Sequence, residues 1–165
     1  MTTEQMNSDI LALLANDSRM TAEEIAKLLH HEPEQVRSAI ARMEKEGIIV
    51  KYSTLINWEK FDSNRVDALI EIKVTLHDGV GFDTLAERIY HYPEVRSLYL
   101  VSGGYDLLVQ VEGKSLREVA QFVNERLATM EGVLSTATHF VLKKYKVEDV
   151  AMEPEMDDQR LVVSP

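Results

Sequence analysis

The spacing of apolar residues near the N-terminus predicts an amphipathic helix. Ile10, Leu13 and Leu14 recur at the i, i+3, i+4 interval of a single helical face. The polar run at residues 16–18 would end that helix. We therefore expect a first helix at about residues 8–15, with one side buried.

Residues 21–47 have the pattern of two further helices joined by a tight turn. Thr21 and Glu24 have the three-residue spacing of a capping box, which marks a helix start. Pro33 interrupts the helical pattern, and a second helix is predicted at about residues 34–46. Gly47 follows, at the position where a left-handed C-terminal cap is expected. This order is typical of a helix-turn-helix, whose second helix enters the major groove of DNA.

After Gly47 the chain is rich in β-branched and aromatic residues, so we expect a short strand within residues 48–56. From Val66 the apolar positions alternate with polar ones, which is the pattern of strands with one buried face. The predicted order is then strand 66–76, helix 82–89, strand 95–101, strand 105–111, helix 116–130 and strand 133–147.

This β-α-β-β-α-β order predicts a ferredoxin-like fold with one layer of helices, so the chain as a whole is an α+β protein. Leu69 and Leu108 fall on the sheet face without helices, where we expect a second subunit. The predicted domains are a (winged) helix-turn-helix at 1–56, a linker at 57–65, a ferredoxin-like domain at 66–147 and an acidic tail at 148–165.

The composition narrows the cellular setting. The chain has 165 residues and no cysteine, which excludes disulfides and fits a reducing cytoplasm. No apolar run approaches the roughly 20 residues that span a bilayer, and the N-terminus lacks the pattern of a signal peptide. The net charge of −10 is unusual for a DNA-binding protein. Half of it lies in residues 148–165, which carry one basic and six acidic residues.

Two segments resemble the Lrp/AsnC family, the leucine-responsive and asparagine regulators. One is the end of the predicted third helix, residues 42–49, with the sequence RMEKEGII. The other is the hairpin at residues 101–108, VSGGYDLL, which is similar to the family signature V-[ST]-G-D-[YF]-D-[YL]-L. The resemblance covers about residues 7–147. It implies a transcriptional regulator that dimerises through its C-terminal sheets, often forms octamers, and senses a small molecule, commonly an amino acid.

The third helix supplies the candidate DNA contacts. Its apolar residues, such as Val36 and Met43, are expected to face the other helices and leave a polar flank outside. An arginine near the helix start can donate two hydrogen bonds to guanine, and residues further along can bind phosphate. The alternative is an ordinary solvated face. The predicted DNA-binding residues are Gln35, Arg37, Ser38, Arg42 and Lys45.

The hairpin supplies the candidate effector site. Glycines let a backbone approach a ligand closely, and a carboxylate can pair with an α-ammonium group. The resemblance places the family's effector site here, between neighbouring dimers, although two adjacent glycines also suit an ordinary hairpin turn. The predicted ligand-binding residues are Ser102, Gly103, Gly104, Tyr105, Asp106, Thr136 and Thr138.

Other functions have weaker signals. His30 and His31 suggest a metal site or a pH switch, but we expect His30 to cap the preceding helix and His31 to be partly buried or near phosphate. Sirohaem decarboxylases share this architecture, so a tetrapyrrole enzyme is one alternative. A regulatory partner of a metabolic enzyme is another. We predict no catalytic residue, cofactor or metal, and a cytoplasmic protein whose partners are duplex DNA, an amino-acid-like effector and copies of itself.

Overall fold

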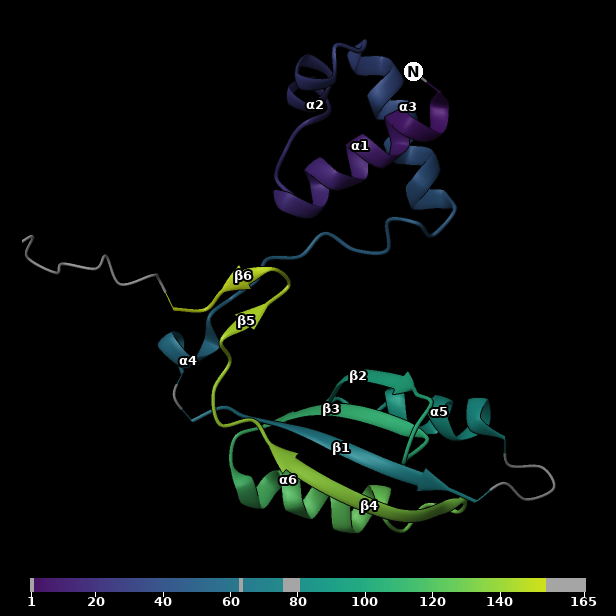
Figure 1. The fold of residues 1–165 in the computed structure, drawn as a ribbon, viewed down its shortest axis with the longest axis vertical. Helices are drawn as coiled ribbons and strands as arrows, with labels where there is room; N and C mark the ends of the chain where they lie inside the picture. The colour runs from purple at the N-terminus through teal and green to yellow at the C-terminus, as the bar shows by residue number, and fades with distance from the viewer. Residues whose placement is uncertain (1, 63, 76–80, 154–165) are drawn as a thin grey trace, which may run out of the picture. The chain divides into compact units, whose positions relative to one another are not determined.

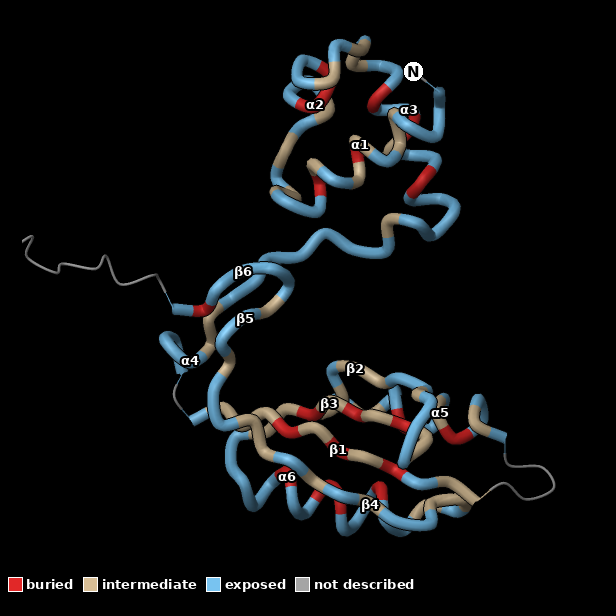
Figure 2. The backbone as a smooth tube through the Cα atoms, in the orientation of Figure 1, coloured by how far each residue is buried: buried red, intermediate tan, exposed pale blue. Residues whose placement is uncertain are grey.

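The computed structural model describes residues 2–62, 64–75 and 81–153 (Figure 1). The chain divides into two compact units, Met1–Ile56 and Asn57–Pro165. Each has a hydrophobic core of its own (Figure 2). They are called here the N-terminal unit and the C-terminal unit, and each is described by itself.

The N-terminal unit contains the three predicted helices, α1 (Thr3–Asn16), α2 (Ala22–Leu29) and α3 (Pro33–Lys45). α1 begins five residues earlier than predicted, because the Thr2 hydroxyl accepts a hydrogen bond from the Gln5 N–H and caps the helix. The predicted capping box of α2 is present: Glu24 N–H donates to the Thr21 hydroxyl, and Thr21 N–H donates to the Glu24 carboxylate. The core side chains are Ile10, Leu14, Ile25, Ala26, Val36, Ala39 and Met43.

The predicted cap at the end of α3 is also present. Gly47 has a φ of +71°, and its N–H donates to the Glu44 carbonyl. The Ile48 N–H donates to the Met43 carbonyl, which completes the paired bonds of a Schellman motif. Glycine is favoured there because a β-carbon is strained in the left-handed region.

The short strand predicted within residues 48–56 is wrong. The structure has no regular element there, and Val50 is 86% exposed. β-rich composition gives a strand only where a neighbouring strand takes up its backbone hydrogen bonds, and the described part of the N-terminal unit offers none. The segment is held by side chains instead: the Tyr52 hydroxyl donates to Glu44 over 2.8 Å, and the Ser18 hydroxyl donates to the Ser53 carbonyl over 3.2 Å.

The C-terminal unit has the predicted ferredoxin-like order. Its main elements are β1 (Val66–Val74), α5 (Phe82–Tyr90), β2 (Val95–Leu100), β3 (Leu107–Gly113), α6 (Leu116–Phe122) with the π-helical turn η1 (Val123–Leu127), and β4 (Val133–Phe140). The strands form one antiparallel sheet in the order β2-β3-β1-β4. The predicted end of the first strand, residue 76, lies outside the described residues.

The two faces of this sheet differ, as the alternating sequence predicts. Ile70 and Ile72 of β1 and Val109 of β3 are buried with side chains of α5 and α6. Buried positions along β1, β3 and α6 are red in Figure 2. Leu69 and Leu108 lie on the opposite face, which the described helices leave uncovered. Tyr99 pairs with Leu108 in register and is 55% exposed there. We call the residues Leu69, Leu108 and Tyr99 the open sheet face.

The ends of the C-terminal unit differ from the prediction. A short helix, α4 (Trp58–Phe61), stands in the predicted linker. The last strand stops at Phe140, and two short strands, β5 (Lys146–Val147) and β6 (Val150–Ala151), form a hairpin where the acidic tail was expected to begin. Glu148 and Asp149 both have positive φ, as a two-residue type I′ turn requires.

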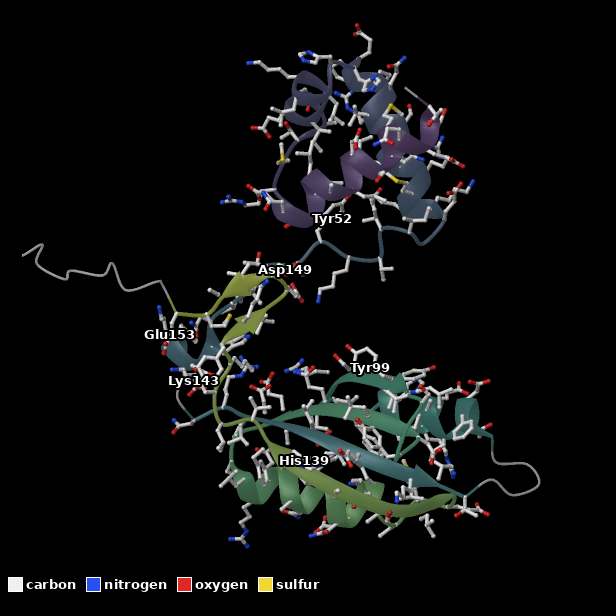
Figure 3. The ribbon with its side chains drawn as sticks, viewed as in Figure 1. Tyr52, Tyr99, His139, Lys143, Asp149 and Glu153 are labelled. Atoms are coloured by element: carbon white, nitrogen blue, oxygen red, sulfur yellow. The ribbon has the colours of Figure 1, made fainter. Side chains whose placement is uncertain are left out.

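This hairpin is tied to the start of the unit. The Met152 N–H donates to the Tyr145 carbonyl, and the Asn57 side chain donates to the Met152 carbonyl over 2.9 Å. Lys143 pairs with Glu153 at 2.8 Å (Figure 3). Residues 148–153 therefore belong to the folded unit, and the rest of the predicted tail lies outside the described residues.

The backbone conformation of His30 predicts the effect of a substitution on stability. It follows α2 with φ 56° and ψ 45°, the left-handed conformation in which a β-carbon is strained. Replacing His30 with Gly should raise the free energy of unfolding of the N-terminal unit by about 1 kcal/mol. Hydrogen exchange of the Ile25 amide, in the core of α2, measures this. Lys27→Gly, inside the same helix, should instead lower it by about 1 kcal/mol. A lower stability for His30→Gly would show that the imidazole contributes more than the strain costs.

Candidate DNA-reading surface and effector loop

The buried stripe of α3 determines which of its residues meet solvent. Val36, Ala39 and Met43 are at most 2% exposed and pack against α1 and α2. The helical period then turns the opposite flank outward. All five predicted DNA-binding residues are exposed on this flank, which we call the reader face: Gln35, Arg37, Ser38, Arg42 and Lys45.

The basic residues of the reader face differ in their contacts. Arg37 donates to Glu34 over 2.6 Å and also bonds Glu23 of α2. These two carboxylates raise the pKa of Arg37 above its ordinary value, Glu23 having the larger effect. Arg42 donates to the Asn7 side chain of α1 over 3.0 Å. Lys45 is exposed in the last turn of α3.

The surroundings of the reader face are acidic. Residues 1–56 carry six Lys or Arg and nine Asp or Glu, a net charge of −3. Phosphate contacts supply most of the sequence-independent affinity for DNA. The affinity of an acidic unit for DNA therefore depends on a few individually placed cations.

The histidine pair lies in the turn between α2 and α3. His30 follows α2 in the left-handed conformation, and its N–H donates to the Ala26 carbonyl. His31 is half-buried, as predicted, and its Nε2 atom is buried without a hydrogen-bond partner among the described residues. No group of three or more His, Asp or Glu side chains in the described ranges is arranged to hold a metal ion.

The predicted effector loop joins β2 to β3 and is tied to the sheet through Asp106. The Val101 N–H donates to the Asp106 carbonyl, and the Asp106 N–H donates to the Ile72 carbonyl. One oxygen of the Asp106 carboxylate accepts the Val74 N–H over 2.8 Å. The third strand therefore begins at Leu107, two residues later than predicted. The side chain of Asp106 therefore supports the end of β1.

The rest of the loop is open. Ser102, Gly103 and Gly104 are exposed, and Tyr105 is half-buried. A β-carbon at Gly103 or Gly104 would meet no other atom within 4 Å. Packing within this chain therefore does not demand glycine at either position, and the backbone is accessible to another molecule.

The two threonines are not gathered with this loop on a single chain. Thr136 and Thr138 pair in register with Ile72 and Ile70, so their side chains lie on the helix-covered face. β1 separates their strand from β3, which is two strand spacings of about 4.8 Å each. The alternation of the last strand gave no means of predicting which neighbour it joins.

A cleft that the sequence did not predict lies beside the loop. It has a volume of about 280 Å³ and lies between α5 and the edge strand β2. Leu100 and Leu107, which flank the loop, form part of its wall. Asp83 and Arg96 add one charge of each sign, and Arg96 also donates to Glu112 over 3.0 Å. The lining of the cleft therefore combines apolar side chains with polar and charged groups, as small-molecule sites do. The cleft exists only because α5 packs beside β2, which no local pattern specifies.

None of the helices within the described ranges combines the length and apolar character that crossing a bilayer requires.

Comparison with known proteins agrees with both units. Residues 6–50 match a winged helix-turn-helix DNA-binding model, and residues 67–151 match the Lrp/AsnC ligand-binding domain. The uncharacterized HTH-type transcriptional regulator YugG of Bacillus subtilis is 46% identical over 162 residues, which is 98% of each chain.

Solved structures share the fold. AsnC of E. coli superposes with a TM-score of 0.71 and 20% identity, covering 89% of this chain and 97% of its own. A transcriptional regulator of Neisseria meningitidis in complex with L-Met gives 0.73 and 24%, covering 88% and 94%. The exposed reader face, the ferredoxin-like sheet and these matches together place the chain in the Lrp/AsnC family of transcriptional regulators, with an N-terminal DNA-binding unit and a C-terminal ligand-binding domain.

Proposed function

We propose that this protein regulates transcription by placing the reader face of α3 in the major groove, and that an amino-acid-like effector alters this binding. The observation that carries the proposal is the exposure of all five reader-face residues on a helix whose other side is fixed in the core. In this proposal Arg37 and Ser38, near the helix start, meet base edges, whereas Arg42 and Lys45 meet phosphates. The protein acts without catalysis and without a cofactor.

The reader face gives a test with two distinct outcomes. Lys45→Ala should weaken binding to all duplexes alike and reduce the slope of log K against log salt by about 1. Arg37→Ala should cost about 1–3 kcal/mol on the cognate site and relax the preference at one base position. Both are measured by titrating the upstream region of the protein's own gene and an unrelated duplex at several salt concentrations.

Lys114→Ala is the matched control for charge. Lys114 is exposed in the C-terminal unit, so its loss should leave the salt slope unchanged. Equal effects of Lys45→Ala and Lys114→Ala would mean that DNA responds to overall charge and not to α3.

The proposed effector site is the loop at residues 102–106 together with the adjacent cleft. The N. meningitidis relative is in complex with L-Met, and the cleft is lined by apolar side chains together with polar groups and one charge of each sign. An amino acid with an apolar side chain fits this chemistry. In the proposal, Asp106 contributes negative charge toward the ammonium group. Thr136 and Thr138 join the site only if a neighbouring subunit brings them to it.

Asp106 allows its structural and ligand-binding roles to be separated. Asp106→Asn keeps an oxygen to accept the Val74 N–H but removes the charge. It should abolish the change in DNA affinity that L-Met or L-Leu causes, while leaving stability and assembly intact. Asp106→Ala should lose the response and also the support of β1. Isothermal titration and DNA binding with each amino acid measure the response. A full response in Asp106→Asn would show that the charge of Asp106 takes no part in effector binding.

We further propose that two copies dimerise through the open sheet face and that dimers assemble further, up to an octamer. Leu69, Leu108 and Tyr99 present apolar surface that the described helices leave uncovered. Pairing copies places two reader faces on one DNA and offsets the weak attraction of an acidic unit.

Assembly through this face predicts that Leu108→Lys lowers the molar mass in solution, because a buried unpaired charge destabilises the interface. Size-exclusion chromatography with light scattering measures the change. Leu142→Lys is the control, since Leu142 is 96% exposed and lies beyond the end of β4. An unchanged mass for Leu108→Lys would place the interface elsewhere.

A further inference from the structure

The side chain of Arg37 links the two helices of the helix-turn-helix. Its Nη1 donates to Glu34, one turn earlier in α3, over 2.6 Å. Its Nη2 bonds Glu23 in the first turn of α2. Arg37 is nevertheless 52% exposed, and Glu23 and Glu34 are 59% and 77% exposed. The three side chains therefore form a surface cluster, not a buried ion pair.

The cluster carries one positive and two negative charges at neutral pH. The pKa of Glu23 is lowered by a hydrogen bond from its own backbone N–H and by its bond to Arg37, so the group stays ionised. Any anion that approaches Arg37 also approaches these two carboxylates. Arg37, which the sequence predicts to contact a base, is thus shielded from a phosphate by Glu23 and Glu34.

A guanidinium has five N–H donors, and the two carboxylates engage two of them. The remaining donors can meet the neutral O6 and N7 acceptors of a guanine without displacing either carboxylate. A phosphate brings a full negative charge, so it is repelled by Glu23 and Glu34 or must displace one of them. The same cluster therefore treats a base edge and a phosphate differently.

We propose that Glu23 is a specificity-determining residue, which acts by weakening the binding of Arg37 to the phosphates of non-cognate DNA. The inference rests on the proposed function, in which α3 reads the duplex. Glu23 does not touch DNA in this mechanism. It supplies the repulsive component that discrimination between partners often requires.

The test is Glu23→Gln, which keeps the length and polarity of the side chain and removes its charge. Binding is measured on the upstream region of the protein's own gene and on an unrelated duplex of equal length, across a range of salt concentrations. The unrelated duplex should bind about two- to fivefold more tightly, the size expected from one exposed charge pair. Cognate affinity should change by less than about twofold, so the specificity ratio falls.

Two controls isolate the mechanism. Glu46→Gln removes the same charge from an exposed position at the other end of α3 and should leave the specificity ratio unchanged. In an Arg37→Ala background, Glu23→Gln should have no further effect on the ratio, because Glu23 acts only through Arg37. Circular dichroism checks that each variant is folded.

Three results would overturn the inference. Equal effects of Glu23→Gln and Glu46→Gln on the specificity ratio would mean that the ratio depends on overall charge and not on the position of Glu23. Weaker cognate binding in Glu23→Gln would make Glu23 a support that positions Arg37, not a barrier to phosphate. An effect that persists without Arg37 would break the link between the two residues. If the unaltered protein retains no duplex at low salt, the proposed function falls as well, which separates that failure from these three.

Discussion

Burial of one stripe of α3 is the constraint on which the proposed DNA-reading surface depends. Val36, Ala39 and Met43 are removed from water against α1 and α2, and burying a Val or Met side chain stabilises a fold by about 1.5–3 kcal/mol. No rotation of α3 keeps these side chains buried and also withdraws the reader face from solvent. The hydrophobic effect thus sets the orientation of polar residues that take no part in the core.

The central strand has the same role in the C-terminal unit. β1 pairs with β3 on one side and β4 on the other, and its alternate side chains fill the core beneath the helices. The proposed effector loop is anchored to β1, since Asp106 bonds the backbone of Ile72 and Val74. A change in the position of Asp106 therefore acts on the end of β1, the strand that also carries Leu69 of the open sheet face. This gives a ligand a physical route to the surface proposed for assembly.

The acidic charge of the N-terminal unit limits its non-specific binding to DNA. A strongly basic unit would bind any duplex, whereas a unit with a net charge of −3 gains little from phosphates alone. Its affinity for DNA therefore depends on individually placed contacts, and the proposed assembly of several copies would add to it. In the proposed mechanism, the carboxylates around Arg37 act in the same way at one side chain: they weaken its binding to phosphate and so increase discrimination between duplexes.

Local patterns in the sequence determined much of this protein. The 3.6-residue period located α1, α2 and α3, the Thr21–Glu24 pair and Gly47 marked helix ends, and the period of two gave the strands and their buried faces. These features depend on residues within a few positions of one another, so they are legible without a structure. The exposure of the reader face followed from the same periodicity.

Tertiary structure alone decided the rest. Residues 48–56 have strand-like composition but no partner strand, and Asn57 ties the hairpin at residues 146–151 to the start of the C-terminal unit through Met152. The bond of Arg37 to Glu23, the use of Asp106 by β1, the cleft beside β2 and the placement of Thr136 all join segments far apart in the chain. Such contacts depend on how elements pack, and the period of a single element carries no information about its neighbours.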